Sequence, residues 1–254
     1  HTVRATPAGL AFADRARRIV TELRLARAEA VSLSTAPQGL IRIDAPVPFG
    51  RRHLAPAVAD FLKANPGLDV QLRLIGSFID LQGEHLGEVD LVLRAGPLPD
   101  SRLVARRLCA HRRILGAAPD YLERHGVPRI PADLAAHNCL GFSGLHSYPE
   151  WKLTRQDEQQ PVRVRGSMVS NDNEALLCAA RQGLGIFAAG EWLMSRDLEA
   201  GRLVRVLPEW QLDADAGVYL VRPSARYATA AGSAFRQWVE ARFAAGPPWQ
   251  RQQD

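Results

Sequence analysis

Residues 40–76 read LIRIDAPVPFGRRHLAPAVADFLKANPGLDVQLRLIG, and this stretch decides the fold of the chain. The first six residues alternate between apolar and polar side chains, which is typical of a β-strand. After the predicted loop PVPFG, large apolar side chains recur at helical spacing from residue 51 onward, and the breaker sequence Asn65-Pro66-Gly67 ends that helix. A second strand follows at residues 70–76. A strand, a helix and a strand in this order predict a parallel sheet with a right-handed crossover.

The same alternation continues to the end of the chain. A short helix at 79–86 precedes VDLVLRAG at 89–96, whose apolar run is typical of a strand buried on both faces. Strands and helices alternate again in the second half, so we expect two α/β subdomains with crossings near Arg113 and Gly217. The elements predicted for that half are strands at 112–119, 139–144 and 217–223, helices at 120–126, 131–138 and 228–243, a hairpin turning at Asp157–Gln160, a helix then a strand within 171–189, and a helix then a strand within 191–210.

The first 35 residues follow a different pattern, that of one long helix. Thr6 is a suitable N-cap, Pro7 fits the first helical position, and neither Pro nor Gly occurs between Leu10 and Ala36. Small or apolar side chains recur at alternating spacings of four and three residues, which is a heptad pattern. We expect a coiled coil with a second copy of the chain, in preference to a single helix lying on the domain surface. The predicted seam comprises Phe12, Ala16, Ile19, Leu23, Ala26, Ala30 and Leu33.

The composition narrows the classes of protein to which the chain can belong. With 254 residues and 46% hydrophobic content, it can bury one large core or two modest ones. No run approaches 18 apolar residues and no basic-then-apolar leader is present, so the sequence favours a cytoplasmic protein without a membrane span. The formal charge of +5 permits contact with nucleic acid without establishing it. Cys109, Cys139 and Cys178 each lie in an apolar run, so we expect three reduced thiols packed in the core.

The sequence carries no recognisable motif for catalysis or metal binding. Its seven His residues show no HExxH spacing, and no CxxC accompanies them. The stretch GFSG at 141–144 lacks the spacing of a nucleophile elbow. RQGLGIF at 181–187 does not lead from a strand into a helix, so Gly183 and Gly185 predict a tight helix-to-strand turn instead of a dinucleotide site. We therefore expect neither an enzyme nor a bound metal or cofactor.

Five phrases, in this order and spacing, resemble the LysR-type transcriptional regulators, and the resemblance covers essentially the whole chain. The phrases are ATPAG at 5–9 (with Ala5 where the family usually has Leu), APVPFGRRHLAPAVADFLKANPGLDVQLRL at 45–74, DLVLRAGPLPDSRLVARRL at 90–108, VSNDNEALLCAARQGLGIF at 169–187 and LEAGRLVRVLPEW at 198–210. The resemblance implies an α/β fold, namely a two-subdomain, periplasmic-binding-protein-like effector domain preceded by a long dimerisation helix.

The resemblance also implies a domain organisation. Residues 1–6 would be the remnant of the wing of a winged helix-turn-helix that precedes this chain, and residues 7–35 the linker and dimerisation helix. Residues 38–247 would form the effector-binding domain, with subdomain I at 38–113 and 218–247 and subdomain II at 114–217. DNA would be bound through the missing N-terminal domain, with Arg4 close to a phosphate. The protein would be a homodimer or homotetramer that responds to a small organic effector.

The ends of the predicted strands give the candidate effector site. Ligands of open α/β sheets bind outside the carboxyl ends of the strands, where strand order reverses, and the resemblance points to the same loops. A helix beginning at Asn171, with Glu174 at capping-box spacing, and the guanidinium of Arg94 would favour an anion. Pro46-Val47-Pro48 lacks the hydroxyl that the family often has there, which favours a more apolar effector. The candidate residues are Pro46, Val47, Phe49, Gly50, Ser77, Phe78, Arg94, Ala95, Phe142, Asn171 and Asp172.

These assignments have structural alternatives. Ser77 can cap the predicted helix at 79–86, Phe142 can belong to the core, Asn171 caps its helix in any case, and Arg94 can pair with Asp80. For the whole chain, the leading hypothesis is a ligand-responsive transcription factor. The alternative is a solute-binding protein of a transport system, which shares the two-lobed architecture. In that class a secretory leader, and not a coiled-coil helix, would precede the first strand.

Overall fold

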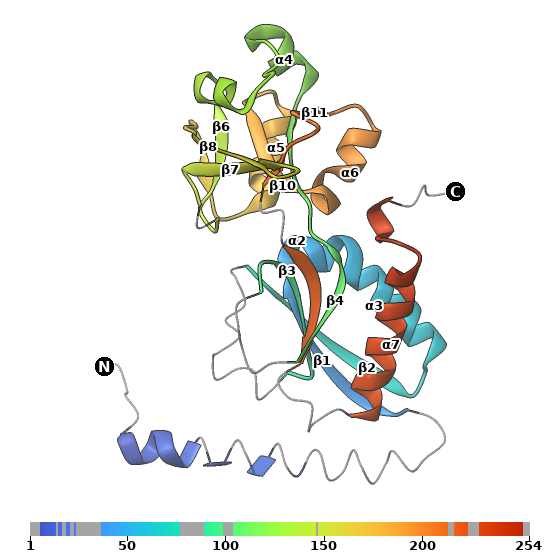
Figure 1. Ribbon diagram of the computed structural model, residues 1–254. Helices are drawn as coiled ribbons and strands as arrows, with labels where there is room; N and C mark the ends of the chain where they lie inside the picture. Colours follow the sequence, from blue (N-terminus) through green and yellow to red (C-terminus); the bar gives the residue numbers. More distant parts are fainter. Residues whose placement is uncertain are drawn as a thin grey trace.

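The computed structural model describes residues 6–13, 15–16, 19–20, 23, 37–76, 89–98, 104–145, 147–212, 216–222 and 229–250. Two sheets organise them into two lobes, which lie one above the other in Figure 1. The chain leaves the lower lobe after β4 (Val104–Ala110) and returns to it at β13 (Gly217–Arg222). The two crossings lie side by side, since the His111 amide donates to the Ala216 carbonyl at 3.0 Å. The predicted two-lobed α/β architecture is therefore confirmed.

The sheet of the lower lobe has the strand order β2-β1-β3-β13-β4. As predicted, β1 (Gly39–Pro46) pairs in parallel with both β2 (Leu68–Ile75) and β3 (Leu91–Gly96). β13 runs antiparallel to β3 and to β4, and neither this direction nor β4 itself was predicted from the sequence. The strand order reverses at β1, so the carboxyl ends of β1 and β3 form a switch point of the kind where ligands bind.

The segment after β1 differs from the prediction, because it is helical and not a loop. α2 (Val47–Phe49) continues through the π-helical turn η1 (Gly50–Leu54) into α3 (Ala55–Ala64) without a break. Pro48 lies in the first turn, where its missing N–H removes no intrahelical hydrogen bond. The buried side chain of Phe49 then anchors this turn to the core. The predicted helix therefore begins four residues earlier than its apolar pattern indicates.

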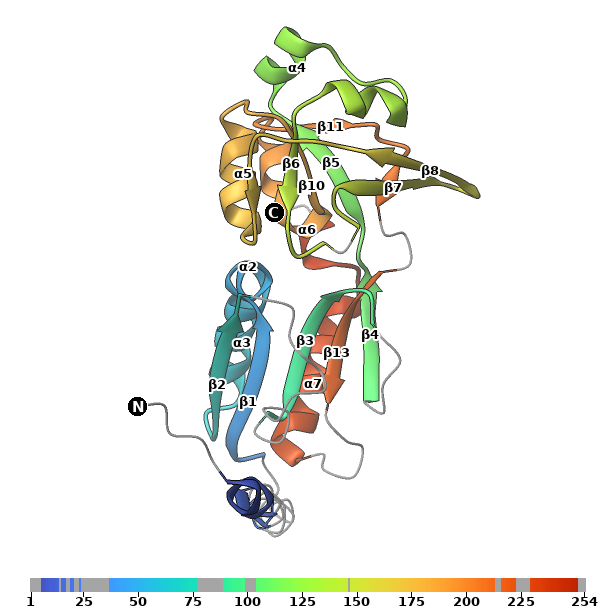
Figure 2. The same cartoon turned by 90° about the vertical axis from the view of Figure 1, so that its left-hand side faces the viewer.

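α7 (Ala230–Ala244) covers the same sheet beside α3, as both views of the lower lobe show (Figures 1 and 2). Thr229 caps it, since its side chain accepts a hydrogen bond from the Gly232 amide. Phe61 of α3 and Phe235 of α7 pack edge to face with ring centroids 5.0 Å apart. These two helices and the inward-facing residues of β1 and β3 form the core of the lower lobe.

The sheet of the upper lobe has the order β8-β7-β12-β5-β10-β6-β9, with β11 pairing to β5. Most of its pairs are antiparallel, and only β6 pairs in parallel with its neighbours. The hairpin turns at Gln156 and Asp157, one residue before the predicted turn, and Gln156 takes a φ of 51°. The strands are β5 (Arg113–Ala117), β6 (Cys139–Phe142), β7 (Glu150–Arg155), β8 (Glu158–Arg163), β9 (Val169–Ser170), β10 (Ile186–Gly190), β11 (Val204–Val206) and β12 (Gln211–Leu212).

Helices cover this second sheet and join its strands. The helix-to-strand turn before β10 contains Gly183 at a φ of 69° and Gly185, whose missing Cβ leaves room for the Asn138 carbonyl. This confirms the turn predicted from the two glycines. The helices are α4 (Pro119–His125), the 3₁₀ turn η3 (Pro131–Ala136), α5 (Asn173–Arg181) and α6 (Glu191–Glu199), and a last 3₁₀ turn, η5 (Pro248–Gln250), follows α7.

The described part of the N-terminal segment is helical. Thr6 caps it, since its hydroxyl accepts from the Gly9 amide at 3.1 Å, and the described residues from 7 to 23 are in helical conformation. The seam side chains of Phe12, Ile19 and Leu23 are more than 60% exposed in the single chain. Ala26, Ala30 and Leu33 lie outside the described residues.

Cysteine placement departs from expectation at one position. Cys139 is buried and Cys109 half-buried, but Cys178 is exposed on α5, so the prediction of three core thiols is wrong for Cys178. Burial raises the pKa of the Cys139 thiol to about 12 and that of Cys109 to about 11. Among the described residues, no helix is long and apolar enough to cross a membrane.

Candidate functional site

The ends of β1 and β3 that form the switch point face the upper lobe (Figure 2). Pro46 is the last residue of β1, and the parallel register Asp44↔Val92 brings Pro46 and Arg94 to the same end of neighbouring strands. Ala95 follows Arg94 within β3. Two parallel strands thus deliver four of the predicted site residues, Pro46, Val47, Arg94 and Ala95, to one edge of the lower sheet.

The upper lobe contributes a second group of residues. Phe142 ends β6 and pairs with Ser170, the last residue of β9. Asn171 and Asp172 follow β9 directly and precede α5. The side chains of Asn171 and Asp172 are exposed, whereas Phe142 is half-buried against the apolar cluster that runs between the lobes. The three predicted residues of this lobe therefore lie together.

A bidentate ion pair joins these two groups across the lobes. Arg52 in η1 donates from Nε and from Nη2 to the two carboxylate oxygens of Glu174 in α5, at 2.8 and 2.9 Å. The side chains are 16% and 32% exposed, so both are partly shielded from water. Arg52 lies six residues after the end of β1, in the helical segment that follows it, and Glu174 lies two residues after Asp172. The ion pair consequently holds the two groups of candidate residues opposite each other.

The start of α5 corrects two predictions. The N-cap is Asp172 and not Asn171, because the Asp172 carboxylate accepts from the Glu174 amide at 2.7 Å. Glu174 makes no capping box, since its carboxylate binds Arg52 instead. Two carboxylates therefore lie at the start of this helix, and their negative charges offset the positive end of the helix dipole that was expected to favour an anion.

Arg94 is a cationic group at the edge of the lower sheet. Its Nε donates to the Pro97 carbonyl at 3.0 Å, which fixes the orientation of the guanidinium. Partial burial lowers the pKa of Arg94, but an arginine stays protonated at neutral pH. Asp80, the predicted alternative partner, and the candidate residues Ser77 and Phe78 lie outside the described residues, as does Arg4.

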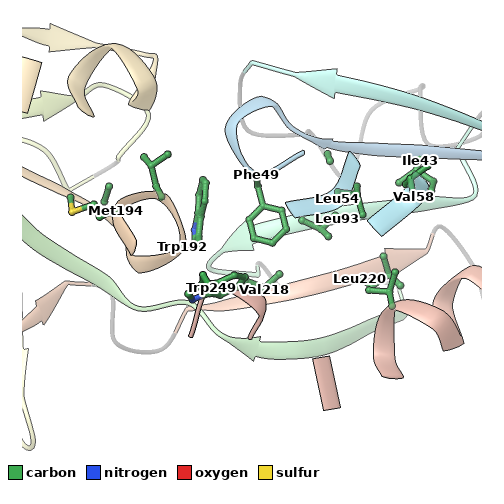
Figure 3. Packing of buried hydrophobic residues seen from close by; sticks show 14 of the residues in the cluster. Ile43, Phe49, Leu54, Val58, Leu93, Trp192, Met194, Val218, Leu220 and Trp249 are labelled. Carbon is green, nitrogen blue, oxygen red and sulfur yellow. The ribbon is translucent and has the colours of Figure 1, made fainter. Parts of the chain in front are cut away.

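Phe49 and Gly50 have a structural role that differs from the predicted one. The Phe49 ring is 1% exposed and packs edge-on against Trp192 of α6 and Trp249 of η5, with centroids 5.1 and 5.8 Å away (Figure 3). A Cβ on the buried Gly50 would come within 2.2 Å of Leu74. Neither side-chain position can form the wall of a ligand site. They belong instead to an apolar joint between the lobes.

Polar contacts complete this joint. Nε2 of His53 donates to the Trp192 carbonyl at 3.0 Å, and the Trp192 indole N–H donates to Nδ1 of His111 at 3.2 Å. Burial lowers the pKa of both histidines, that of His111 to about 3, so both rings are neutral at physiological pH. His111 lies at the first crossing and contacts Trp192 of α6, and Trp249 beyond α7 packs against His53, so the joint ties the crossings, α6 and the end of α7 together.

Comparison with known proteins identifies the family. Residues 34–244 match the model of the LysR substrate binding domain. The chain is 33% identical over 214 residues to the HTH-type transcriptional activator TtdR of Escherichia coli K12, a match that covers 84% of this chain and 68% of TtdR. The chain belongs to the LysR-type transcriptional regulators.

Other members of the family agree in sequence and in fold. The chain is 34% identical over 214 residues to the HTH-type transcriptional regulator PtxR of Pseudomonas aeruginosa, covering 84% of this chain and 67% of PtxR. The structure of CrgA, a LysR-type transcriptional regulator from Neisseria meningitidis, aligns over 94% of this chain and 80% of its own with a TM-score of 0.71 and 29% identity. These similarities confirm the predicted function of a transcriptional regulator and do not favour the solute-binding alternative.

Several residues that organise this LysR-type site were missed at the sequence level. They are Arg52 and Glu174, which pair across 122 positions, and the joint residues His53, His111, Trp192 and Trp249. Trp249 even lies beyond the predicted domain end at residue 247. The conspicuous signal was the Trp in GPPWQ near the end of the chain, because a large aromatic residue after a helix end usually packs against something. Among the described residues, no group of three or more His, Cys, Asp or Glu side chains is placed to hold a metal ion.

Proposed function

We propose that this LysR-type regulator responds to one small organic effector that binds between its lobes, beside the switch point of the lower sheet. The observation that carries the proposal is that Pro46, Val47 and Arg94 share one strand edge, and that the Arg52–Glu174 pair holds Phe142 and Asp172 opposite it. Residues from both lobes would then contact a single ligand. Ser77 and Phe78 stay in the proposed site on the strength of the sequence alone.

The chemistry of these residues favours an apolar effector with a single carboxylate. Arg94 supplies a guanidinium, whose positive charge and planar fork of N–H donors match the geometry of a carboxylate. Asp172 and Glu174 oppose a second negative charge on the side of the upper lobe. Pro46 and Pro48 offer no N–H donors, while Val47 and Phe142 offer apolar surface. A site with few polar anchors and an apolar wall is typical for small ligands.

Regulation requires that the effector bind two arrangements of the lobes unequally, since equal affinity shifts no equilibrium. The lobes are connected by two adjacent crossings, by the apolar joint and by the Arg52–Glu174 pair. Of these, the ion pair is the most easily exchanged, because both of its groups retain some contact with water. We infer that a bound carboxylate alters the lobe orientation by competing with this pair or reinforcing it.

The organisation of the whole protein is part of the same proposal. Residues 7–35 would form a dimerising coiled coil in a homodimer or homotetramer, because an exposed row of large apolar side chains needs a partner. Residues 38–247 would bind the effector in the cytoplasm. DNA would be bound by a winged helix-turn-helix that precedes them, and Arg4 would approach a phosphate. The protein would have no enzymatic activity.

The test joins the chain to its upstream coding sequence and measures binding to the intergenic DNA beside its gene. Thermal-shift screening of organic acids first identifies an effector. Fluorescence anisotropy at physiological salt should then show that the effector changes DNA affinity, and that Arg94→Gln abolishes this change while leaving effector-free DNA binding intact. An effector response that survives Arg94→Gln, or DNA affinity that no bound acid alters, would contradict the proposal.

A further inference from the structure

A pocket of about 390 Å³ opens in the lower lobe, between α7 and the strands β3, β4 and β13. It is lined by the first residue of β3, the first residues of β4 and the last residues of β13. These ends lie away from the upper lobe, as the course of the strands in Figure 2 shows. Leu91 in the pocket and Arg94 at the proposed effector site stand on the same strand, about 10 Å apart at 3.3 Å per residue. The pocket is therefore a separate feature that does not depend on the proposed effector site.

The strand register explains why both apolar and charged side chains line this pocket. Leu220 of β13 lies opposite Arg106 of β4, and Arg222 lies opposite Val104. Because residues two apart on a strand share a face, all four side chains project to the side that α7 covers. Leu220, like Leu91, is 3% exposed and forms part of the core beneath α7. The pocket consequently has an apolar floor and a cationic rim.

The charges at the rim do not balance. Glu240 of α7 accepts from Nη1 of Arg236 at 2.9 and 3.1 Å, and its Oε1 lies 3.7 Å from Nε of Arg106. Within the part of the chain that the structure describes, the half-buried side chain of Arg222 has no hydrogen bond or ion pair. Among the described residues that line the pocket, the charged groups are therefore three guanidinium groups and one carboxylate. A half-buried cation beside apolar surface gains most from an anion that brings an apolar part with it.

We propose that this pocket is a second ligand site, which takes a small monocarboxylate with an apolar tail. The carboxylate binds Arg222 and draws Arg106 away from its long contact with Glu240, and the tail lies on Leu91 and Leu220. Arg236 keeps Glu240 in place, so the bound carboxylate does not meet an uncompensated negative charge. The ligand chemistry is that of a short fatty acid or a similar amphipathic acid.

Titration calorimetry of the full chain with hexanoate tests this assignment, with hexan-1-ol as the uncharged analogue. Hexanoate should bind saturably and hexan-1-ol at least about tenfold more weakly, because one charge-assisted hydrogen bond is worth about that factor. Arg222→Gln should weaken hexanoate binding at least tenfold, and Arg222→Lys by less, since it keeps the charge and loses the planar fork. Arg129→Gln, which removes a charge from an exposed loop of the upper lobe, is the matched control and should leave affinity unchanged.

Three results would overturn the assignment. They are the absence of saturable hexanoate binding, equal affinity of the parent and a folded Arg222 variant, and equal affinity for the acid and the alcohol. Loss of hexanoate binding in Arg94→Gln, with Arg222→Gln unaffected, would place the acid at the interlobe site and would likewise refute the second site. Thermal unfolding of each variant shows that it is folded, and Arg222→Lys preserves the test if Arg222→Gln is unstable.

Discussion

The Arg52–Glu174 pair gives the most quantitative prediction about how the lobes are held. Glu174→Gln and Arg52→Gln, singly and together, form a double-mutant cycle that isolates the interaction between the two side chains. Glutamine retains the length of Glu174 and leaves the Asp172 cap intact, because that cap uses only the amide of residue 174. The cycle therefore reports the ion pair without disturbing the helix start.

The structure sets the expected size of the coupling. Fully exposed ion pairs contribute about 0.2–1 kcal/mol, and hydrogen bonds to charged groups shielded from water contribute about 1.5–3 kcal/mol. With two short hydrogen bonds and side chains 16% and 32% exposed, this pair falls between the two classes. We expect a coupling free energy of about 1–2 kcal/mol in urea unfolding at 25 °C.

The matched control is the pair Asp120–Arg124 on α4, whose side chains are 60% and 55% exposed. Its coupling should stay near 0.3–0.5 kcal/mol, as for other exposed helical pairs. If the coupling of Arg52 and Glu174 is no larger than that of the control, the pair does not hold the lobes together, and the regulatory argument built on it fails.

Three further predictions concern stability and assembly. His111→Gln should make the free energy of unfolding depend less on pH. Because burial lowers the pKa of His111 to about 3, only the unfolded chain binds a proton at this residue as the pH falls from 7 to 5.5. Over that interval, urea titrations should show that the free energy of unfolding of the parent falls by about 1.2 kcal/mol more than that of the variant. Asp197→Asn should cost about 3 kcal/mol in urea unfolding, because the fully buried carboxylate offsets two arginines, and a cost below 1 kcal/mol would contradict this reading. Ile19→Asp combined with Leu23→Asp should shift the light-scattering mass toward the monomer, whereas an unchanged mass would show that the helix seam is not the main interface.

The sequence was sufficient to predict those helices, strands and turns that are specified by a local residue pattern. The apolar residues Ile41, Ile43 and Ala45 of β1 are buried as the alternation predicts, although Asp44 between them is buried too. Gly183 and Gly185 turn the chain before β10 as predicted. β4 was missed because it is an edge strand, with four exposed residues in a row and no alternation to reveal it. β9 and β12 are two residues long, which is too short for any periodic signal.

The candidate site was predictable in outline but not in its contacts. The strand-end rule located Pro46, Arg94 and Phe142 correctly at the facing edges of two sheets. Asn171 and Asp172 are both good N-caps, and only the backbone conformation of the folded chain selects Asp172. The sequence could not reveal the pairing of Arg52 with Glu174, because it depends on how two lobes meet, and local periodicity carries no information about that.

The central claim is that a carboxylate effector binds at Arg94 between the lobes, and calorimetry on the identified effector tests it most directly. Arg94→Gln should weaken binding by about 1.5–3 kcal/mol, a factor of about 10 to 150, through the loss of one charged hydrogen bond. Arg129→Gln should bind the effector as the parent does, and both variants should unfold at the parent temperature. If the effector binds a folded Arg94→Gln variant as tightly as it binds the parent, the effector does not occupy this site, and the account of how this regulator senses its ligand is wrong.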